Sequence, residues 1–547
     1  MEKFSMHLEY RANGKHYTTH DFETDHFKID YQAFQNHIVM KLIPKVPVEI
    51  LYLSLSLPYV FSDDDRIFLN GYQSWTDCRE MFVDEIPPHT TGLMTHIYRH
   101  TLLGASGAYN FVDNDSNPGE FLGFSYMYVR NGEHFDLFAS LNERTGYTVF
   151  KTKTRLDELR FKKDLGGIII YDEYEIMNVA HFSGTEDEVF DKWFDVLGVK
   201  KPDAKPMNGY TTWYNYYPHI NEKIVNDDLE ALSQVQADID IFQIDDGFQT
   251  ATGDWLSIDA SKFPHGMKAA VNKIHEKKML AGLWLAPFGA QFTSKILREH
   301  RDWFIKHPNG RLVQAGPNWG GFAALDIENP EVREYIRNFF DVVLNDWGFD
   351  LVKLDFLYAA AIIPYHNKTR GQLMCEAMDF LRECVGDKKI LGCGVPLMPA
   401  FGKVDYCRIG ADMDLRWNKP TFSHREFVST INTLGNSTFR RQLDGRAFLN
   451  DPDVFLLREN NMHMNFEQRC IIATVNKLFG SVLFTSDNVG DYREEQMDKL
   501  LEVFKKDDIE IIRAEFMPDN RRVLDIDYTI NGEFKSFRFD LQHGVIL

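Results

Sequence analysis

Two charged side chains interrupt an otherwise apolar stretch of the chain, FDLVKLDFLY (349–358). They are Lys353 and Asp355, and side chains two residues apart on a β-strand point to the same face. A charge on a dry face is costly unless an opposite charge lies beside it. The spacing therefore indicates either a structural ion pair or a catalytic carboxylate with its electrostatic partner.

Further acidic residues stand at the ends of other apolar runs. They are Asp245 and Asp246, Asp412 (which follows Arg408 by four residues), Asp451 and Asp453, and Asp487. Each aspartate alone is more typical of a helix N-cap or a turn. As a set they predict one acidic rim, provided that the runs are strands of one parallel sheet. Two carboxyl groups across a sugar can cleave its glycosidic bond, one as nucleophile or base and the other as acid.

The middle of the chain predicts the elements that would position these residues. Apolar segments alternate there with helical segments, and the predicted strands cover 209–217, 238–247, 278–287, 349–356, 389–396, 405–413, 446–454 and 480–487. Eight such strands favour a (β/α)₈ TIM barrel, whose catalytic residues lie at the carboxyl ends of the strands. A doubly wound open sheet is the alternative, but no GxGxxG or Walker sequence follows a strand to support it.

The flanking segments read as β structure. Up to about residue 200, short alternating runs are separated by turn residues, which is typical of an antiparallel β-sandwich. The tail returns to β alternation. The predicted fold class is α/β and β multidomain: an N-terminal β-sandwich (1–200), a (β/α)₈ barrel (201–495) and a small C-terminal β domain (496–547).

The barrel segment resembles a known clan of retaining α-galactosidases, glycoside hydrolase families 36 and 27, and most closely a divergent member of family 36. The motifs that carry the resemblance occur in the family's order: DDGF (245–248), GLWLAP (282–287), LDIENPEV (325–332), KLDF (353–356), GCG (392–394), RIGAD (408–412) and NDPDV (450–454). In the N-terminal part, NGYQSW (70–75) is similar to a stretch in the β domain of such proteins.

The resemblance implies roles for individual residues. Asp355 would be the nucleophile and Asp412 the acid/base, and retention would then place their carboxyl groups about 5 to 7 Å apart. Lys353 would bind a hydroxyl and support Asp355, whose ionised form it favours. Asp245 and Asp246 would bind the O4 and O6 hydroxyls.

The remaining implied positions complete a sugar pocket. Arg408 and Cys393 would lie near the 2-substituent, while Trp284 and Trp213 would shape the pocket. Trp75, in NGYQSW, is either a core aromatic of the β domain or a lid on the sugar.

The identity of the sugar depends on the side of the pocket that faces the 2-position. Cys393 and Gly394 are small, and Arg408 can donate a hydrogen bond to either substituent, so galactose ranks first and N-acetylgalactosamine second. An α-galactosyl transferase of the same fold and a catalytically inactive sugar-binding protein are alternatives. Because both Asp355 and Asp412 are present, we predict a retaining exo-α-glycosidase that acts on α-galactoside oligosaccharides and needs no cofactor.

Charge and composition exclude several classes of partner. The net charge of −21 argues against nucleic acid and anionic membranes. No apolar run approaches the ~18 residues of a membrane-spanning helix, and the first residues do not read as a secretory signal. The six cysteines form no CxxC pair, which indicates reduced thiols in a cytoplasmic protein. A homo-oligomer is compatible with the sequence.

Two further patterns could suggest a metal site. His96 and His100 stand four residues apart, as two ligands on a helix do, but their context reads as β and no third ligand is near. In the resembled clan the NDPD run (450–453) is structural. We predict surface or packing roles for the histidines and no metal.

Overall fold

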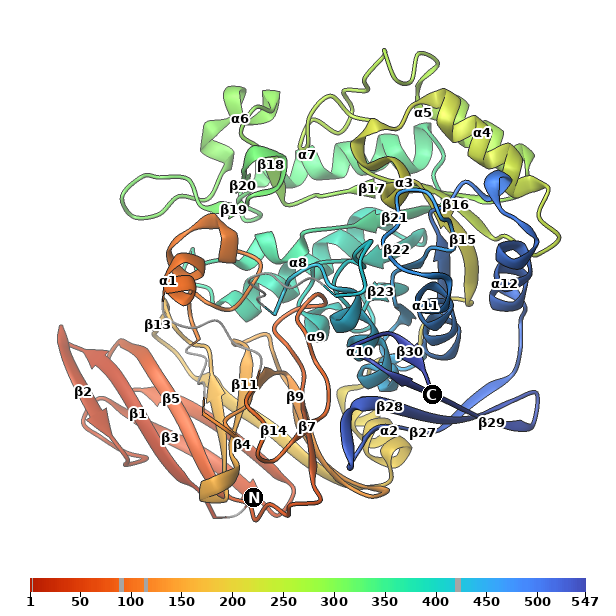
Figure 1. Ribbon diagram of the computed structural model, residues 1–547. Helices are drawn as coiled ribbons and strands as arrows, with labels where there is room; N and C mark the ends of the chain where they lie inside the picture. Colours follow the sequence, from red (N-terminus) through yellow and green to blue (C-terminus); the bar gives the residue numbers. More distant parts are fainter. Residues whose placement is uncertain (2, 88–92, 113–116, 419–424) are drawn as a thin grey trace.

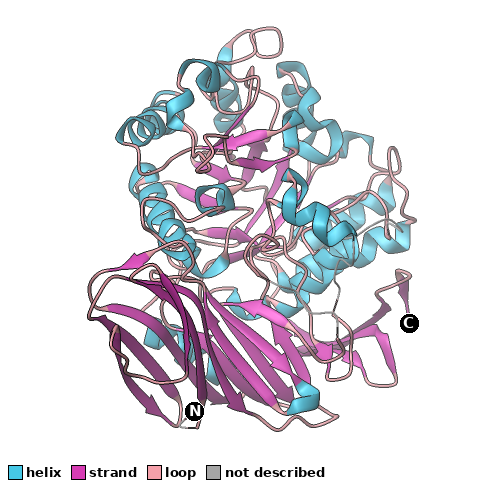
Figure 2. Ribbon diagram, turned by 90° about the vertical axis from the view of Figure 1, so that its left-hand side faces the viewer, coloured by secondary structure: helices cyan, strands magenta, loops and turns pink. Residues whose placement is uncertain are grey.

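The computed structural model describes residues 1, 3–87, 93–112, 117–418 and 425–547. Figure 1 shows three parts: a β-sandwich from the first part of the chain, a central barrel ringed by helices, and a small sheet near the C-terminus. In Figure 2 the sandwich and the C-terminal sheet both lie beneath the barrel. The predicted multidomain fold class is confirmed.

The N-terminal part is a sandwich of two antiparallel seven-stranded sheets. Alternate residues of their strands face the core, as Met6, Leu8, Tyr10 and Ala12 do in the first strand. This alternation is typical of a sheet with one buried and one solvent-exposed face. One sheet contains β1 (Ser5–Ala12), β2 (Lys15–Thr19), β5 (Val48–Pro58), β8 (Leu122–Phe124), β11 (Thr148–Lys153), β12 (Glu158–Lys163) and β13 (Ile169–Ile170). The other contains β3 (Phe27–Phe34), β4 (His37–Pro44), β6 (Arg66–Leu69), β7 (Met81–Phe82), β9 (Tyr126–Asn131), β10 (His134–Ser140) and β14 (Tyr174–Gly184).

One connection of the sandwich is helical. Helix α1 (Leu93–His100) lies between β7 and β8 in the chain. The predicted β context of His96 and His100 was therefore wrong: both residues are on this helix, with His96 exposed. Short-range alternation did not distinguish this amphipathic stretch from a strand. Among the described residues, no three His, Cys, Asp or Glu side chains are grouped so that they could hold a metal ion.

The barrel consists of parallel strands in the order of the chain. Only Pro452 and Asp453 separate β24 from β25, so these are two halves of one interrupted barrel strand. The first half pairs with β23 and the second with β26, which pairs in turn with β15 and closes the ring. The strands are β15 (Met207–Thr211), β16 (Ile241–Ile244), β17 (Leu280–Leu285), β21 (Leu351–Leu354), β22 (Lys389–Gly392), β23 (Tyr406–Arg408), β24 (Leu449–Asp451), β25 (Val454–Phe455) and β26 (Val482–Thr485).

All eight predicted barrel strands are present, but they are shorter than the predicted segments. The segment 209–217 leaves the sheet after Thr211 and continues as helix α3 (Trp213–Tyr216). Its aromatic residues favour strands in isolation, but in the structure Trp213, Tyr214 and Tyr216 belong to this short helix. The acidic residues Asp245, Asp246, Asp355 and Asp412 lie just beyond the strands, in the connections to the helices, whereas Lys353 is still within β21.

Helices surround the barrel, and several of them begin at a residue whose side chain caps the first turn. At the start of α7 (Pro330–Asp341), the Asn329 side chain accepts a hydrogen bond from the Glu331 N–H, and Pro330 fills the first helical position. None of the helices in the described residues combines the length and apolar character needed to cross a bilayer. The other barrel helices are α4 (Glu222–Ser233), α5 (Gly266–Glu276), α6 (Lys295–Glu299), α8 (Arg370–Val385), α9 (Leu397–Ala400), α10 (Thr430–Phe439), α11 (Phe466–Phe479) and α12 (Glu494–Phe504).

Three further elements complete the fold. A small antiparallel sheet of β18 (Gly289–Gln291), β20 (Phe322–Ala324) and β19 (Gln314–Gly316) is inserted after β17. Helix α2 (Glu186–Leu197) follows the sandwich, and its Trp193 indole donates to the Ser140 carbonyl of β10. The C-terminal sheet contains β27 (Ile509–Met517), β28 (Asn520–Ile530), β29 (Glu533–Asp540) and β30 (Val545–Ile546). The predicted end of the barrel at residue 495 falls inside α12, which follows the last barrel strand.

Candidate active site

A cavity of about 270 Å³ opens at the carboxyl ends of the barrel strands. Of the predicted site residues, only Arg408, Cys393 and Gly394 are absent from its wall. Its lining residues come from the barrel rim, from the inserted sheet and from the sandwich: Trp75, Leu103, Ser106, Trp213, Asp245, Asp246, Trp284, Pro317, Asn318, Trp319, Lys353, Asp355, Phe356, Tyr358, Ala411, Asp412, Glu426, Phe427 and Val428.

Lys353 makes its ion pair across the barrel rather than along its own strand. Its Nζ lies 2.9 Å from Oδ2 of Asp245, which follows β16, and both side chains are buried. Burial by itself lowers the pKa of Lys353, but Asp245 raises it well above its ordinary value, with a further contribution from Asp355. Lys353 therefore stays positively charged. It pairs directly with Asp245 and favours the negative charge of Asp355 from a longer distance.

Asp355 follows the end of β21, and neutral donors fix its carboxylate. Oδ2 accepts from the Trp284 indole at 3.0 Å, and Oδ1 accepts from the Phe356 N–H at 2.8 Å. Burial raises the pKa of Asp355, Lys353 acts against this, and Asp412 adds to the rise. The favourable effect expected from Lys353 is present, but burial outweighs it. The two hydrogen bonds hold the carboxylate toward the cavity in a defined orientation.

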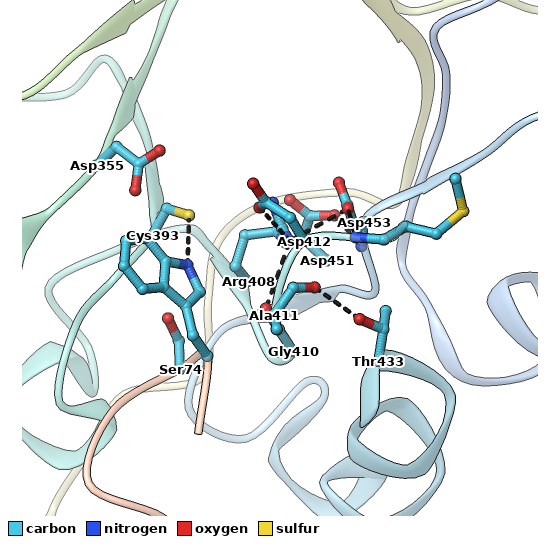
Figure 3. A network of polar contacts seen from close by, with 12 residues as sticks. Ser74, Asp355, Cys393, Arg408, Gly410, Ala411, Asp412, Thr433, Asp451 and Asp453 are labelled. Carbon is cyan, nitrogen blue, oxygen red and sulfur yellow. Dashed lines mark hydrogen bonds and ion pairs between the residues drawn. The ribbon is translucent and has the colours of Figure 1, made fainter. Parts of the chain in front are cut away.

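Asp412 lies in the loop that follows β23, with Arg408 behind it. The Arg408 Nη2 is 3.0 Å from Oδ1 of Asp412, and Figure 3 shows this contact on the far side of the site from Asp355. The Asp412 side chain is 37% exposed, whereas that of Arg408 is only 1% exposed. Arg408 therefore orients Asp412 from within the barrel and does not reach the cavity wall.

The adjacent acids Asp245 and Asp246 are held by separate sets of donors. Besides Lys353, Asp245 accepts from Gln243 Nε2 at 3.1 Å. Asp246 accepts from the Trp319 indole at 2.8 Å and from Gln249 Nε2 at 2.6 Å. Burial raises the pKa of Asp246, and the hydrogen bonds from Trp319 and Gln249 oppose the rise. Two such carboxylates can accept hydrogen bonds from two hydroxyl groups held in a fixed relative geometry.

Aromatic rings form a continuous wall beside the carboxylates. Trp319 lies 5.8 Å from Trp284 and 4.9 Å from Phe356, and Phe356 lies 5.2 Å from Trp75, measured between ring centroids. Such faces suit the apolar CH surface of a sugar. Trp319 was not predicted. The one signal in its segment GPNWGG is the pair of glycines that follows it, which is typical of a turn; in the structure Trp319 has φ +56° and both glycines have positive φ.

Trp75 reaches this wall from the sandwich. Its indole N–H lies 3.3 Å from Sγ of Cys393, and a Cβ atom at Gly394 would come within 2.9 Å of its ring. Cys393 and Gly394 are therefore packed behind Trp75 instead of lining the cavity. Of the two alternatives left open for Trp75, contact with the cavity is the one observed.

Buried polar contacts hold the segment 70–78 in the barrel. The Ser74 N–H donates to the Val395 carbonyl at 2.9 Å. Arg440, at the end of α10, donates to the carbonyls of Ser74 at 2.6 Å, Gln73 at 3.2 Å and Ile409 at 2.7 Å, and to Oδ1 of Asn70 at 3.1 Å. The sandwich thereby contributes a fixed part of the cavity.

Five further lining residues of the cavity were not predicted. Leu103 and Ser106 come from the connection between β7 and β8, and Glu426, Phe427 and Val428 come from the segment before α10. Tyr109 donates to Oε2 of Glu426 at 2.8 Å. These residues carry no motif, and contacts between distant segments bring them together.

Lys353→Met should destabilise the barrel. The change leaves the buried Asp245 carboxylate with neutral donors only, and breaking a buried pair in this way costs about 3–5 kcal/mol. Urea unfolding followed by circular dichroism measures the loss in the free energy of unfolding. Lys223→Met, which breaks the exposed pair with Asp227 on α4, is the matched control and should cost at most about 1 kcal/mol. Equal costs for the two variants would contradict the importance of the Lys353–Asp245 pair.

Comparison with known proteins relates the barrel to one group of enzymes. Residues 207–377 match the family described as Melibiase. The α-galactosidase AgaA of Geobacillus stearothermophilus is 25% identical over 320 residues, which cover 55% of this chain and 41% of that protein. The "A type blood alpha-D-galactosamine galactosaminidase" of Flavonifractor plautii is 30% identical over 135 residues, covering 23% of this chain and 12% of that protein. The matched part thus spans less than half the length of these curated relatives.

Solved structures extend the likeness to the other parts of the chain. TtGalA, an α-galactosidase from Thermus thermophilus in complex with p-nitrophenyl α-D-galactopyranoside, superposes with a TM-score of 0.72 and 23% identity, covering 98% of this chain and 100% of that one. The GH36 α-galactosidase AgaA gives a TM-score of 0.63 at 12% identity, covering 93% of this chain and 72% of that one. At these identities the likeness is one of fold.

Proposed function

We propose that this chain, which is related to the family 36 α-galactosidases, is a retaining exo-α-glycosidase that removes terminal α-D-galactosyl residues by double displacement. The observation that carries the proposal is the presence of Asp355 and Asp412 in one cavity with the acidic pair Asp245 and Asp246. A pair of catalytic carboxyl groups and a set of fixed acceptors for sugar hydroxyls are what glycoside hydrolysis requires.

In the first chemical step, Asp412 donates its proton to the glycosidic oxygen while the Asp355 carboxylate attacks C1. The C1–O bond breaks, the leaving group departs as an alcohol, and a covalent glycosyl ester forms on Asp355. In the second step Asp412 takes a proton from water, whose oxygen attacks C1 and displaces Asp355. Asp355 is suited to attack because the Trp284 and Phe356 donors fix its orientation.

Binding of the sugar would use the adjacent acids and the aromatic wall of the same cavity. Asp245 and Asp246 accept hydrogen bonds from the O4 and O6 hydroxyls, and the aromatic wall packs against the sugar face. We take the substrate class, α-galactoside oligosaccharides, from the enzymes named above. The Thermus enzyme has also been solved in complex with stachyose. Because all six cysteines are free thiols, we place the protein in the cytoplasm.

The test is the ratio of kcat/KM values on three p-nitrophenyl glycosides. The α-galactoside should be preferred over the N-acetyl-α-galactosaminide, and the α-glucoside should react least because its equatorial O4 does not match an axial-O4 site. The first sugar released, followed by proton NMR, should be the α-anomer. Preference for the α-glucoside would contradict the sugar assignment, and release of the β-anomer would contradict retention.

A further inference from the structure

Two large aliphatic side chains in the wall of the cavity remain exposed to solvent. Leu103 is 45% exposed and Val428 39% exposed, whereas Asp245 and Asp246 of the same wall are 2% and 4% exposed. A single exposed leucine or valine is ordinary on a protein surface. Here two of them line one cavity, together with Phe427, the chain neighbour of Val428. Binding of sugar hydroxyl groups does not account for this apolar part of the wall.

The turn that carries Leu103 is fixed by its neighbours. Leu103 lies on the short 3₁₀ helix η1 (Leu102–Gly104), and its N–H donates to the side chain of the N-cap Thr101 at 3.3 Å. A Cβ atom at Gly104 would lie 2.2 Å from the Tyr98 carbonyl oxygen, so the turn packs against α1 more closely than any other residue would allow. On another side η1 contacts β19. Leu103 is therefore held at a defined place in the cavity wall.

The segment that carries Val428 is fixed next to Asp412. The following residue, Ser429, donates its N–H to the Asp412 carbonyl at 3.1 Å. At the other end of the segment, the Arg425 guanidinium donates to the Asp77 carbonyl at 2.9 Å. Val428 is thus anchored beside the residue that would protonate the leaving oxygen.

A carboxylate joins the two segments. Oε2 of Glu426 accepts from the Tyr109 hydroxyl at 2.8 Å, and Oε1 accepts from the Thr76 hydroxyl at 3.1 Å. Both oxygens of Glu426 are therefore engaged in holding this part of the wall together. The side chains of Leu103 and Val428 beside it offer no hydrogen-bonding group to a ligand.

Burial of the catalytic carboxyl groups gives the direction in which a glycoside lies. Asp355 is buried, whereas the Asp412 side chain is 37% exposed. The cavity of about 270 Å³ is at the small end for ligand pockets and leaves little room beyond one sugar ring. A sugar whose C1 faces Asp355 must place its glycosidic oxygen by Asp412, so the group attached to that oxygen extends toward the exposed part of the wall.

We propose that Leu103, Phe427 and Val428 form the subsite for the aglycone, and that this subsite takes an apolar group such as an alkyl chain in preference to a second sugar. The inference rests on the proposed function, which orients the glycoside, and it narrows the substrate of the same site. An alkyl chain lying on these side chains removes apolar surface from water on both partners. A sugar in the same place would lose water from its hydroxyl groups without gaining hydrogen bonds from leucine or valine.

Three α-galactosides test the proposal through kcat/KM: the hexyl glycoside, the methyl glycoside and melibiose, in which galactose is joined to O6 of glucose. Hexanol and the O6 group of glucose are both primary alcohols, so they place similar demands on the acid. Each buried methylene should contribute about fourfold, so the hexyl glycoside should exceed the methyl glycoside by about tenfold or more. It should also exceed melibiose. A hexyl-to-methyl ratio near one, or a preference for melibiose, would overturn the proposal.

Substitutions of similar shape assign the effect to this part of the wall. Val428→Thr should lower the hexyl-to-methyl ratio about threefold and Leu103→Asn about fivefold, because each replaces apolar contact with a polar group. Both side chains are exposed, so the fold should tolerate the changes. Val60→Thr, the same exchange at an 81% exposed valine after β5, is the control and should keep the wild-type ratio. A wild-type ratio in both Val428→Thr and Leu103→Asn would refute the assignment of the subsite.

Calorimetry with uncleaved thioglycosides separates this inference from the proposed function. Hexyl α-thiogalactoside should bind about tenfold more tightly than methyl α-thiogalactoside, with a more negative heat-capacity change on binding. A protein that shows this difference but cleaves no glycoside would refute the glycosidase assignment and leave the apolar subsite standing. Cleavage of α-galactosides together with equal binding of the two thioglycosides would refute the subsite and leave the glycosidase assignment standing.

Discussion

Asp355→Asn should reduce kcat on p-nitrophenyl α-galactoside by about 10³-fold or more while galactose still binds. The amide has nearly the shape of the carboxylate, and its oxygen can still accept from Trp284 or from the Phe356 N–H. It cannot form the ester with C1, so the covalent route is lost, and removal of a nucleophile typically has effects of this size or larger. Steady-state kinetics measure the loss, and isothermal titration calorimetry with galactose measures the retained binding.

Two comparisons make this result specific. Asp346→Asn changes an exposed aspartate nine positions earlier on the connection to the same strand and should leave kcat unchanged. Asp355→Gly with added azide should yield the β-galactosyl azide, because azide then attacks C1 from the side that the carboxylate occupied. More than a tenth of the wild-type activity in Asp355→Asn, or an α-linked azide, would remove Asp355 from the nucleophile's role.

Asp412→Asn should divide substrates according to their leaving groups. The loss of kcat/KM on methyl α-galactoside should be about 10²- to 10⁴-fold, the usual contribution of a general acid. The loss on p-nitrophenyl α-galactoside should be much smaller, because this leaving group departs without a full proton. The parameter kcat/KM reports on the steps up to the first chemical step only. Loss of Asp412 as the base of the second step therefore does not affect the comparison.

Asp414→Asn is the matched control for Asp412. It lies on the same loop, its Oδ1 accepts from the Arg416 N–H, and it does not belong to the cavity wall. The ratio of the kcat/KM values for methyl α-galactoside and p-nitrophenyl α-galactoside should be the same in Asp414→Asn as in the wild type. Equal losses on both substrates in Asp412→Asn would mean that Asp412 supports the fold of the site rather than proton transfer.

The barrel could be predicted because its signals are local. Each strand is a short apolar run followed by polar residues, and parallel strands bring such ends to one rim whatever their separation in the chain. Asp245, Asp246, Lys353, Asp355 and Asp412 line one cavity for this reason. Their roles, carried over from the resemblance, await the kinetic tests.

Partners that depend on packing across the barrel could not be predicted. The spacing of Lys353 and Asp355 suggested that they pair with one another, yet Lys353 pairs with Asp245, 108 residues away. Strand spacing shows which residues share a face, but the depth of each side chain in the barrel decides which charges meet. Arg408 was likewise expected beside the sugar and is instead covered by Asp412.

Residues supplied by other parts of the chain were the hardest to assign. Trp319 comes from the connection between β19 and β20 of the inserted sheet, and the sequence around it has no strand or helix period. For Trp75, core and lid remained equal alternatives because no local pattern indicates that a β-sandwich segment enters a barrel. Only the contacts of the segment 70–78 with Val395 and Arg440 determine its position.

The contacts of Arg440 bear on how the protein is made. Ser74, one of its acceptors, is synthesised 366 residues before it. At about 5–20 residues per second this is a delay of roughly 20–70 s, during which the segment 70–78 lacks the guanidinium of Arg440. Once α10 and Arg440 have emerged from the ribosome, the Arg440 guanidinium can donate to the four neutral acceptors that it contacts in the finished structure. A ribosome that reads the two parts in the opposite order, as in a circular permutant, would present the cation before most of its acceptors exist.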